Sequence, residues 1–234
     1  MQNIFKRHEA KYLITKAQKA LLLDTISQYV VSDKFDEYIV QNLYYDTENW
    51  DIIHRSIEKP LFKEKMRLRC YGLKTQDSKF FLELKKKYKG IVYKRRIAFS
   101  GMMLSDSGVR DIVEQEASQI AHELDFYLKS VPVRERMYLS YKRSAYAGTE
   151  DSGLRMTFDT DVRYRVHDLD FKQPDKGSPI LSPEKVIMEI KVPYGMPLWL
   201  VQILSENEIY PASFSKCGVC YADYVQKQKA TGVA

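Results

Sequence analysis

Two runs of residues give the strongest indication of the fold, Lys65-Met66-Arg67-Leu68-Arg69-Cys70-Tyr71 and Phe80-Phe81-Leu82-Glu83-Leu84-Lys85-Lys86-Lys87. In both runs apolar and charged residues alternate, and this period of two is typical of a β-strand with one apolar and one polar face. Met66, Leu68 and Cys70 share one face of the first strand, and the basic residues share the other. The two runs therefore predict neighbouring strands of an antiparallel meander, joined by a polar turn.

Further strands are predicted on both sides of this pair, at residues 5–14, 39–45, 90–99, 131–146, 154–165 and 185–192. Thr15 is the predicted N-cap of a helix that includes Val30. Other helices are predicted at residues 50–56, 105–129, 197–206 and 216–227. The chain shows no repeats and no long linker, so we expect one α+β domain over residues 1–229 and a flexible tail at 230–234. Its expected architecture is an eight-stranded antiparallel sheet or barrel with flanking helices.

The composition is typical of a packed globular protein. Of the 234 residues, 44% are hydrophobic and 29% are charged, which excludes general disorder. No apolar run approaches the roughly 20 residues that a membrane helix needs, and the first residues contain no apolar stretch typical of a signal peptide. The three cysteines, Cys70, Cys217 and Cys220, do not make a disulfide framework, so the expected location is the cytoplasm.

The positive charge is concentrated in one part of the chain. The net charge is +6, yet the segment from Arg55 to Arg96 carries fifteen Lys or Arg against four acids, a net charge of +11, which leaves −5 for the remainder. Six strands place Lys or Arg in their middle, and like charges repel across a sheet unless something neutralises them. We therefore expect this polar face to line a barrel interior that binds a phosphate chain. The carboxylates on that face would hold Mg²⁺ or Mn²⁺. The alternative is an ordinary sheet with its charged face in water.

Eight short motifs occur in the order found in one known family. They are Phe5-Lys6-Arg7-His8-Glu9-Ala10-Lys11-Tyr12, Tyr44-Tyr45-Asp46-Thr47, Arg67-Leu68-Arg69-Cys70-Tyr71, Glu83-Leu84-Lys85-Lys86-Lys87, Tyr141-Lys142-Arg143-Ser144-Ala145-Tyr146, Arg155-Met156-Thr157-Phe158-Asp159, Met188-Glu189-Ile190-Lys191 and Phe214-Ser215-Lys216. In these motifs the chain resembles the VTC domain, the catalytic domain of the vacuolar transporter chaperone polyphosphate polymerase. That domain belongs to the triphosphate tunnel metalloenzyme superfamily.

The resemblance implies an eight-stranded antiparallel β-barrel tunnel and a phosphotransferase that moves the γ-phosphoryl group of ATP onto a growing polyphosphate chain. It implies a set of cations that act on the phosphates: Lys11, Arg67, Arg69, Lys85, Arg143, Arg155 and Lys216. A second set would bind the substrate: Lys87, Lys94, Arg96, Lys191 and Ser215. Glu189 would coordinate Mn²⁺ or Mg²⁺, and Glu9 and Glu83 are the other candidate metal ligands. A membrane connection would need a separate partner.

Two positions depart from related proteins. The related CYTH hydrolases and cyclases begin with Glu-x-Glu-x-Lys, whereas this chain has Arg7-x-Glu9-x-Lys11, and the loss of one acidic metal ligand favours the polymerase branch. Ser213 stands where polymerases often carry another Lys, which predicts weaker phosphate binding at that end.

Other functions stay open at this point. A triphosphate or polyphosphate hydrolase of the same superfamily is the second hypothesis, and a non-catalytic polyanion-binding module is the third. The basic run 85–89 is compatible with nucleic-acid binding, but the aromatic residues mostly lie on the opposite faces, as core residues would, so we expect no nucleic-acid partner. Cys217 and Cys220 have C-x-x-C spacing without a second pair of ligands, which favours buried thiols over a zinc site.

Overall fold

The computed structural model describes residues 8–33, 35–89, 91–150 and 153–232. They divide into two compact units, each assembled from separated segments. Unit 1 comprises residues 1–38, 141–162 and 179–216, and unit 2 comprises residues 39–140, 163–178 and 217–234. The single domain over residues 1–229 stays a prediction. In the predicted tail, α6 (Lys216–Ala230) ends where the tail was expected to begin, and residues 233–234 lie outside the described ranges.

In unit 1 the strands follow the order β1-β10-β8-β7, with bounds His8–Thr15, Lys185–Val192, Arg155–Arg165 and Arg134–Gly148. The antiparallel register places Glu9 opposite Lys191 and Lys11 opposite Glu189. The short strand β2 (Val30–Ser32) pairs with β7. Because of this register, charged residues of two strands that are far apart in the sequence lie opposite one another in the sheet.

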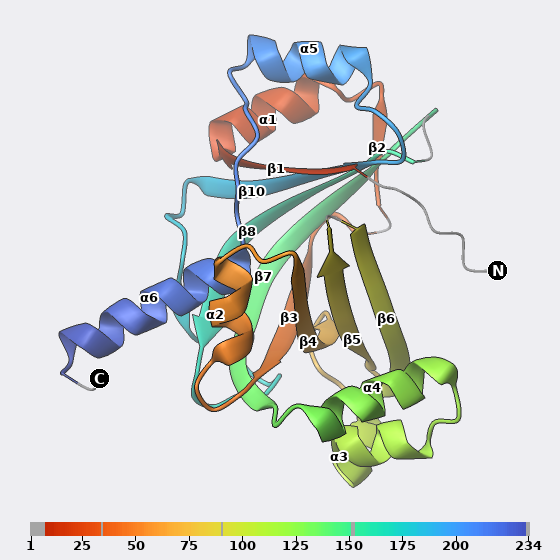
Figure 1. The fold of residues 1–234 in the computed structure, drawn as a ribbon. Helices are drawn as coiled ribbons and strands as arrows, with labels where there is room; N and C mark the ends of the chain where they lie inside the picture. The colour runs from red at the N-terminus through yellow and green to blue at the C-terminus, as the bar shows by residue number, and fades with distance from the viewer. Residues whose placement is uncertain (1–7, 34, 90, 151–152, 233–234) are drawn as a thin grey trace. The chain divides into compact units, whose positions relative to one another are not determined.

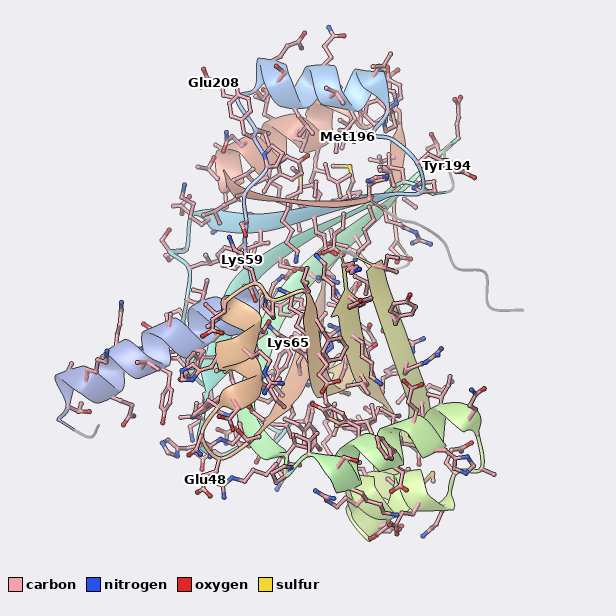
Figure 2. The ribbon with its side chains drawn as sticks, in the orientation of Figure 1. Glu48, Lys59, Lys65, Tyr194, Met196 and Glu208 are labelled. Carbon is pink, nitrogen blue, oxygen red and sulfur yellow. The ribbon has the colours of Figure 1, made fainter. Side chains whose placement is uncertain are left out.

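Two helices, α1 (Lys16–Thr25) and α5 (Leu198–Glu206), lie over β1 and β10 in unit 1 (Figure 1). Thr15 begins α1 as predicted, because its hydroxyl accepts a hydrogen bond from the Gln18 backbone at 3.0 Å. The apolar sides of the helices and strands form one core, in which Leu22, Met188 and Leu200 are fully buried. Met196, just before α5 (Figure 2), accepts a hydrogen bond from the buried Tyr12. The predicted extension of α1 to Val30 is wrong, since the helix ends at Thr25 and a turn follows.

In unit 2 the order is β7-β3-β4-β5-β6, in which β3 spans Tyr38–Asp46, β4 Phe62–Tyr71, β5 Lys79–Tyr88 and β6 Ile91–Ser100. The predicted alternation is confirmed in this unit, because every second residue of β4 and β5 is buried on the apolar face. These residues are Met66, Leu68, Cys70, Phe80, Leu82 and Leu84. The opposite face is not simply in water. Arg69 is 7% exposed and Glu83 only 1% exposed.

Helices α2 (Asp51–Ile57), α3 (Gly101–Gln115) and α4 (Gln119–Ser130) cover the apolar face and the end of this sheet (Figure 1). The single helix predicted at residues 105–129 is therefore wrong. Glu116 adopts an extended conformation, and the Ser118 hydroxyl caps the new helix by accepting from the Ala121 backbone at 3.2 Å. Gly108 is also non-helical, with φ of 72°, a value that glycine adopts without strain.

The fold is α+β with an antiparallel sheet, as predicted, but the sheet contains ten strands rather than eight. The two unpredicted strands are short, β2 and β9 (Ser178–Pro179), and both pair off the main path. Among the described residues the main path is open, with β1 at one end and β6 at the other. None of the helices in the described ranges combines the length and apolar composition that a membrane crossing requires.

Candidate active site

Glu83 is the centre of the charged face in unit 2. Its side chain lies on β5 between β4 and β6, opposite Arg67 and Arg96 in the strand register. The Arg67 guanidinium reaches Glu83 Oε2 through Nε at 2.8 Å and Nη2 at 2.7 Å. Lys94 Nζ lies 2.5 Å from Oε1, and Arg96 Nη1 lies 3.8 Å from the same oxygen. One buried carboxylate thus holds three of the predicted phosphate-binding cations.

The tyrosines around this face fix the arginines further. Arg67 Nη1 donates to the Tyr44 hydroxyl at 3.2 Å. Arg69 donates through Nε to Asn42 Oδ1 at 2.9 Å and through Nη1 to the Tyr71 hydroxyl at 3.3 Å. Because both guanidinium groups are bound at several atoms, their orientation is fixed, as recognition of phosphate oxygens requires.

The charges at this face determine the protonation state of Glu83. Burial by itself raises the pKa of Glu83, but Arg67, Arg69 and Lys94 outweigh it and lower that pKa to about 2. The pKa of Lys94 is also lowered, first by burial, although Glu83 opposes that effect. Glu83 is therefore ionised at neutral pH, and it binds the cations as a full negative charge.

The Glu83 face has a large excess of positive charge. Lys65, Arg67, Arg69, Lys85, Lys94 and Arg96 give six positive charges against the single carboxylate, a local charge of +5. In the register Lys85 lies opposite both Lys65 and Lys94, so three lysines stand in one row across adjacent strands. Such a row is unfavourable without a counter-charge, and an anion with several phosphates would supply one.

A second charged cluster lies on β1 and β10 in unit 1. Lys11 Nζ is 3.2 Å from Glu9 and 3.8 Å from Glu189, and Lys191 forms ion pairs with the same two acids. Burial raises the pKa of Glu189, but Lys191, Lys11 and Lys216 together lower it to about 2. The cluster is a crossed set of two acids and two lysines, and its net charge is zero.

Asp159 on β8 forms a third group of ion pairs, also in unit 1. It is fully buried, and it accepts two hydrogen bonds from Arg143, Nε to Oδ1 at 2.6 Å and Nη2 to Oδ2 at 2.7 Å. Lys216 Nζ lies 2.6 Å from Oδ2. Burial raises the pKa of Asp159, but Lys216 and Arg143 lower it overall. The ring of Tyr141 lies within 5.1 Å of both cations.

The chemistry of the carboxylates decides which of them fit a divalent metal. Mg²⁺ is commonly held by one or two carboxylates together with the phosphates of its substrate. Glu9 and Glu189 fit this pattern, because they lie on adjacent strands and share their lysine partners. Glu83 fits poorly, since three cations surround its carboxylate. Within the described ranges no group of three or more His, Cys, Asp or Glu is placed to hold a metal by itself.

Several predicted residues lie outside these groups of ion pairs. Lys87 is exposed on β5, opposite Lys63 and Val92. Arg155 is exposed on β8 and lies 4.0 Å from Asp33, rather than beside Asp159. Ser215 is exposed immediately before α6. Of the first motif, Arg7 lies outside the described residues.

Sequence reasoning did not select Asp159, Tyr44 or Asn42 as site residues. Asp159 was detectable in principle, because its alternation with Arg155 and Thr157 places it on the polar face. The alternation of β3 carries no such signal for Tyr44 and Asn42, since burial along that strand is nearly continuous. Cys217 and Cys220 are buried, which agrees with the prediction of buried thiols, and burial raises the pKa of the Cys217 thiol.

Three solved structures share this fold. A candidate adenylate cyclase from Bacillus halodurans is 14% identical, with a TM-score of 0.53 over 88% of this chain and 92% of that one. A candidate adenylyl cyclase from Hippeastrum with a dominant triphosphatase activity is 16% identical, with a TM-score of 0.54 over 92% and 95%. A candidate adenylate cyclase from Vibrio parahaemolyticus is 12% identical, with a TM-score of 0.51 over 94% and 99%. At these identities the similarity shows the fold alone.

No curated protein is significantly similar to the chain in sequence. A family model does match: the model of the VTC domain covers residues 6–225, nearly the whole chain and all eight motifs except Phe5. The arrangement of cations around buried acids, the antiparallel α+β fold and this match agree, and the chain belongs to the VTC domain family.

Proposed function

We propose that this protein is a metal-dependent polyphosphate polymerase that transfers the γ-phosphoryl group of ATP to a growing polyphosphate chain. The observation that carries the proposal is the Glu83 face of a VTC domain, where six cations share a face with one buried carboxylate and leave a local charge of +5. The closed eight-stranded tunnel belongs to the same proposal, and its support is the family rather than the strand pairing.

Phosphoryl transfer requires charge neutralisation and in-line positioning more than covalent catalysis. Arg67 suits a fixed contact, because two of its donors already bind Glu83 and hold the planar guanidinium in one orientation toward a phosphate. Lys85, Lys87, Lys94 and Arg96 would neutralise further phosphates. Lysines suit a chain that must advance, since an ammonium group imposes no planar geometry on its partner.

The metal would lie at Glu189, with Glu9 as a second ligand. A Mn²⁺ or Mg²⁺ ion held by these two carboxylates would supply positive charge to neutralise the phosphates of the substrate. Metal binding would also compete with Lys11 and Lys191 for the two carboxylates, and the ammonium groups would then be available to phosphate. Arg143, Arg155, Ser215 and Lys216 are the remaining proposed phosphate contacts.

A hydrolase that releases free phosphate is the alternative. The triphosphatase activity of the Hippeastrum protein, which shares the fold, supports it. Against it stands the first motif, which has one acid at Glu9 where the related hydrolases have two. With fewer acidic ligands, the site is less suited to hold a metal ion that activates the water molecule that hydrolysis requires.

Incubating the protein with ATP and Mn²⁺ and resolving the products on a gel tests the proposal. A polymer ladder is expected, and free phosphate alone would support the hydrolase instead. At a Mn²⁺ concentration that is half-maximal for wild type, Glu189→Gln should strongly reduce the turnover, whereas replacement of an exposed acid on α5, Glu206→Gln, should leave it unchanged. Wild-type protein that yields neither product would contradict both enzymatic functions.

A further inference from the structure

Asp159 is the most deeply buried acid of unit 1, with 0% of its surface exposed. Both of its oxygens are used. The guanidinium of Arg143 occupies one oxygen with Nε and the other with Nη2, and the ammonium of Lys216 shares the second oxygen. The two cations come from β7 and from the first residue of α6, and this carboxylate joins them directly.

Stability alone gives a weak reason for this arrangement. Burying a carboxylate is costly, and apolar side chains of similar volume commonly replace buried ion pairs without loss of stability. Asp159 takes no part in the apolar core of its own strand, because Met156 and Phe158, which form that core, lie on the opposite face of β8. The position of the acid therefore calls for a role beyond packing.

The same device occurs in unit 2. Glu83 receives two donors from one arginine, Arg67, and one ammonium from Lys94. In each unit a buried carboxylate thus joins an arginine to a lysine, with Arg96 as a further and more distant partner of Glu83, and all of these cations are proposed phosphate ligands. Because the same arrangement recurs in separate parts of the chain, we take the role of the acids to be to hold the cations in position.

We propose that Asp159 is a positioning residue that fixes Arg143 and Lys216 at the separation needed to bind successive phosphate oxygens; this rests on the proposed function. A guanidinium has five N–H donors and an ammonium three. Asp159 takes two from Arg143 and one from Lys216, so donors of both groups stay available to the substrate. The carboxylate also reduces the repulsion between the two cations before phosphate arrives.

Asp159→Asn tests the proposal, with turnover of ATP and binding of inorganic tripolyphosphate measured separately. We expect kcat to fall by about 100-fold, the loss typical of a misplacement of about 1 Å. The dissociation constant for tripolyphosphate should stay the same or decrease, because the site gains a positive charge. Asp168→Asn, which removes an exposed acid paired with Lys176, is the matched control and should behave as wild type.

A cycle with Lys216→Gln shows whether Asp159 acts through its partner. The double variant should have nearly the same kcat as Lys216→Gln alone, and additive losses would overturn the proposal. If Asp159→Asn does not fold, Asp159→Glu keeps the charge but displaces it by one methylene. Lower kcat with unchanged tripolyphosphate affinity then supports positioning, and wild-type kcat overturns it.

The remaining outcomes separate this proposal from the proposed function. An Asp159→Asn variant with wild-type kcat would overturn the positioning role while the polymerase stands. Parallel losses of kcat, tripolyphosphate affinity and melting temperature would show a structural role and overturn it too. If wild-type protein neither turns over ATP nor binds tripolyphosphate, both proposals fall.

Discussion

Replacing Glu83 by Gln should change how the stability of the protein depends on pH. Gln has the shape of a protonated carboxyl group but cannot become charged, so it removes the ion pairs with Arg67 and Lys94 while it keeps the volume. The pKa of Glu83 is lowered from 4.5 to about 2 in the folded protein. This difference corresponds to about 3 kcal/mol of unfolding free energy at neutral pH.

The direction follows from the lowered pKa. A carboxyl group with a lowered folded-state pKa contributes stability above its unfolded pKa of 4.5, and the contribution is lost as the pH falls through about 2. The unfolding free energy of wild type should therefore exceed that of Glu83→Gln by about 3 kcal/mol at pH 7, by about half of that at pH 3 and by about a tenth of it at pH 2. Glu83 itself needs no allowance for solvent screening, because its side chain is 1% exposed.

Urea unfolding of both proteins at these three pH values measures the difference. Other lowered pKa values, such as that of Glu189, affect both proteins equally and cancel. Glu123→Gln is the matched control, since Glu123 also pairs with a lysine and an arginine, Lys86 and Arg95, but is 29% exposed. It should cost under about 1 kcal/mol. A stability difference for Glu83→Gln that stays constant from pH 7 to pH 2 would refute the reasoning.

Three further predictions concern the site and the fold. Arg67→Lys keeps the positive charge but loses the two-donor contact with Glu83, so kcat for ATP turnover should fall by about tenfold or more. An unchanged kcat would argue against a fixed contact between Arg67 and phosphate. Glu189→Gln should raise the Mn²⁺ concentration for half-maximal activity by about 10–100-fold, and an unaltered titration would exclude Glu189 as a ligand. Thr15→Ala removes the acceptor for the Gln18 backbone N–H at the start of α1, so the unfolding free energy measured by thermal melting should fall by about 1 kcal/mol. A fall of under about 0.3 kcal/mol would show that the cap contributes little.

Most of the secondary structure could be predicted from the sequence, because the alternation of apolar and polar residues along a strand indicates which side chains share a face. Met66 and Leu68 are buried and Arg67 lies on the opposite face, as the period of two predicted. The predictions failed where a single turn outweighs periodicity. Apolar spacing continues through residues 105–129, but the Ser118 cap starts a new helix inside it.

The family, the strand faces and the types of charged residue at the candidate site can be read from the sequence. The pairing of each acid with its cations is visible only in the folded chain. Glu83 could have faced a metal, yet it lies between Arg67 of β4 and Lys94 of β6, and Asp159 joins Arg143 to Lys216 across a long stretch of chain. The physical reason is that local periodicity fixes the direction of a side chain from its own backbone. Its partners depend on strand register and on which distant segments pack together, and no local pattern records these.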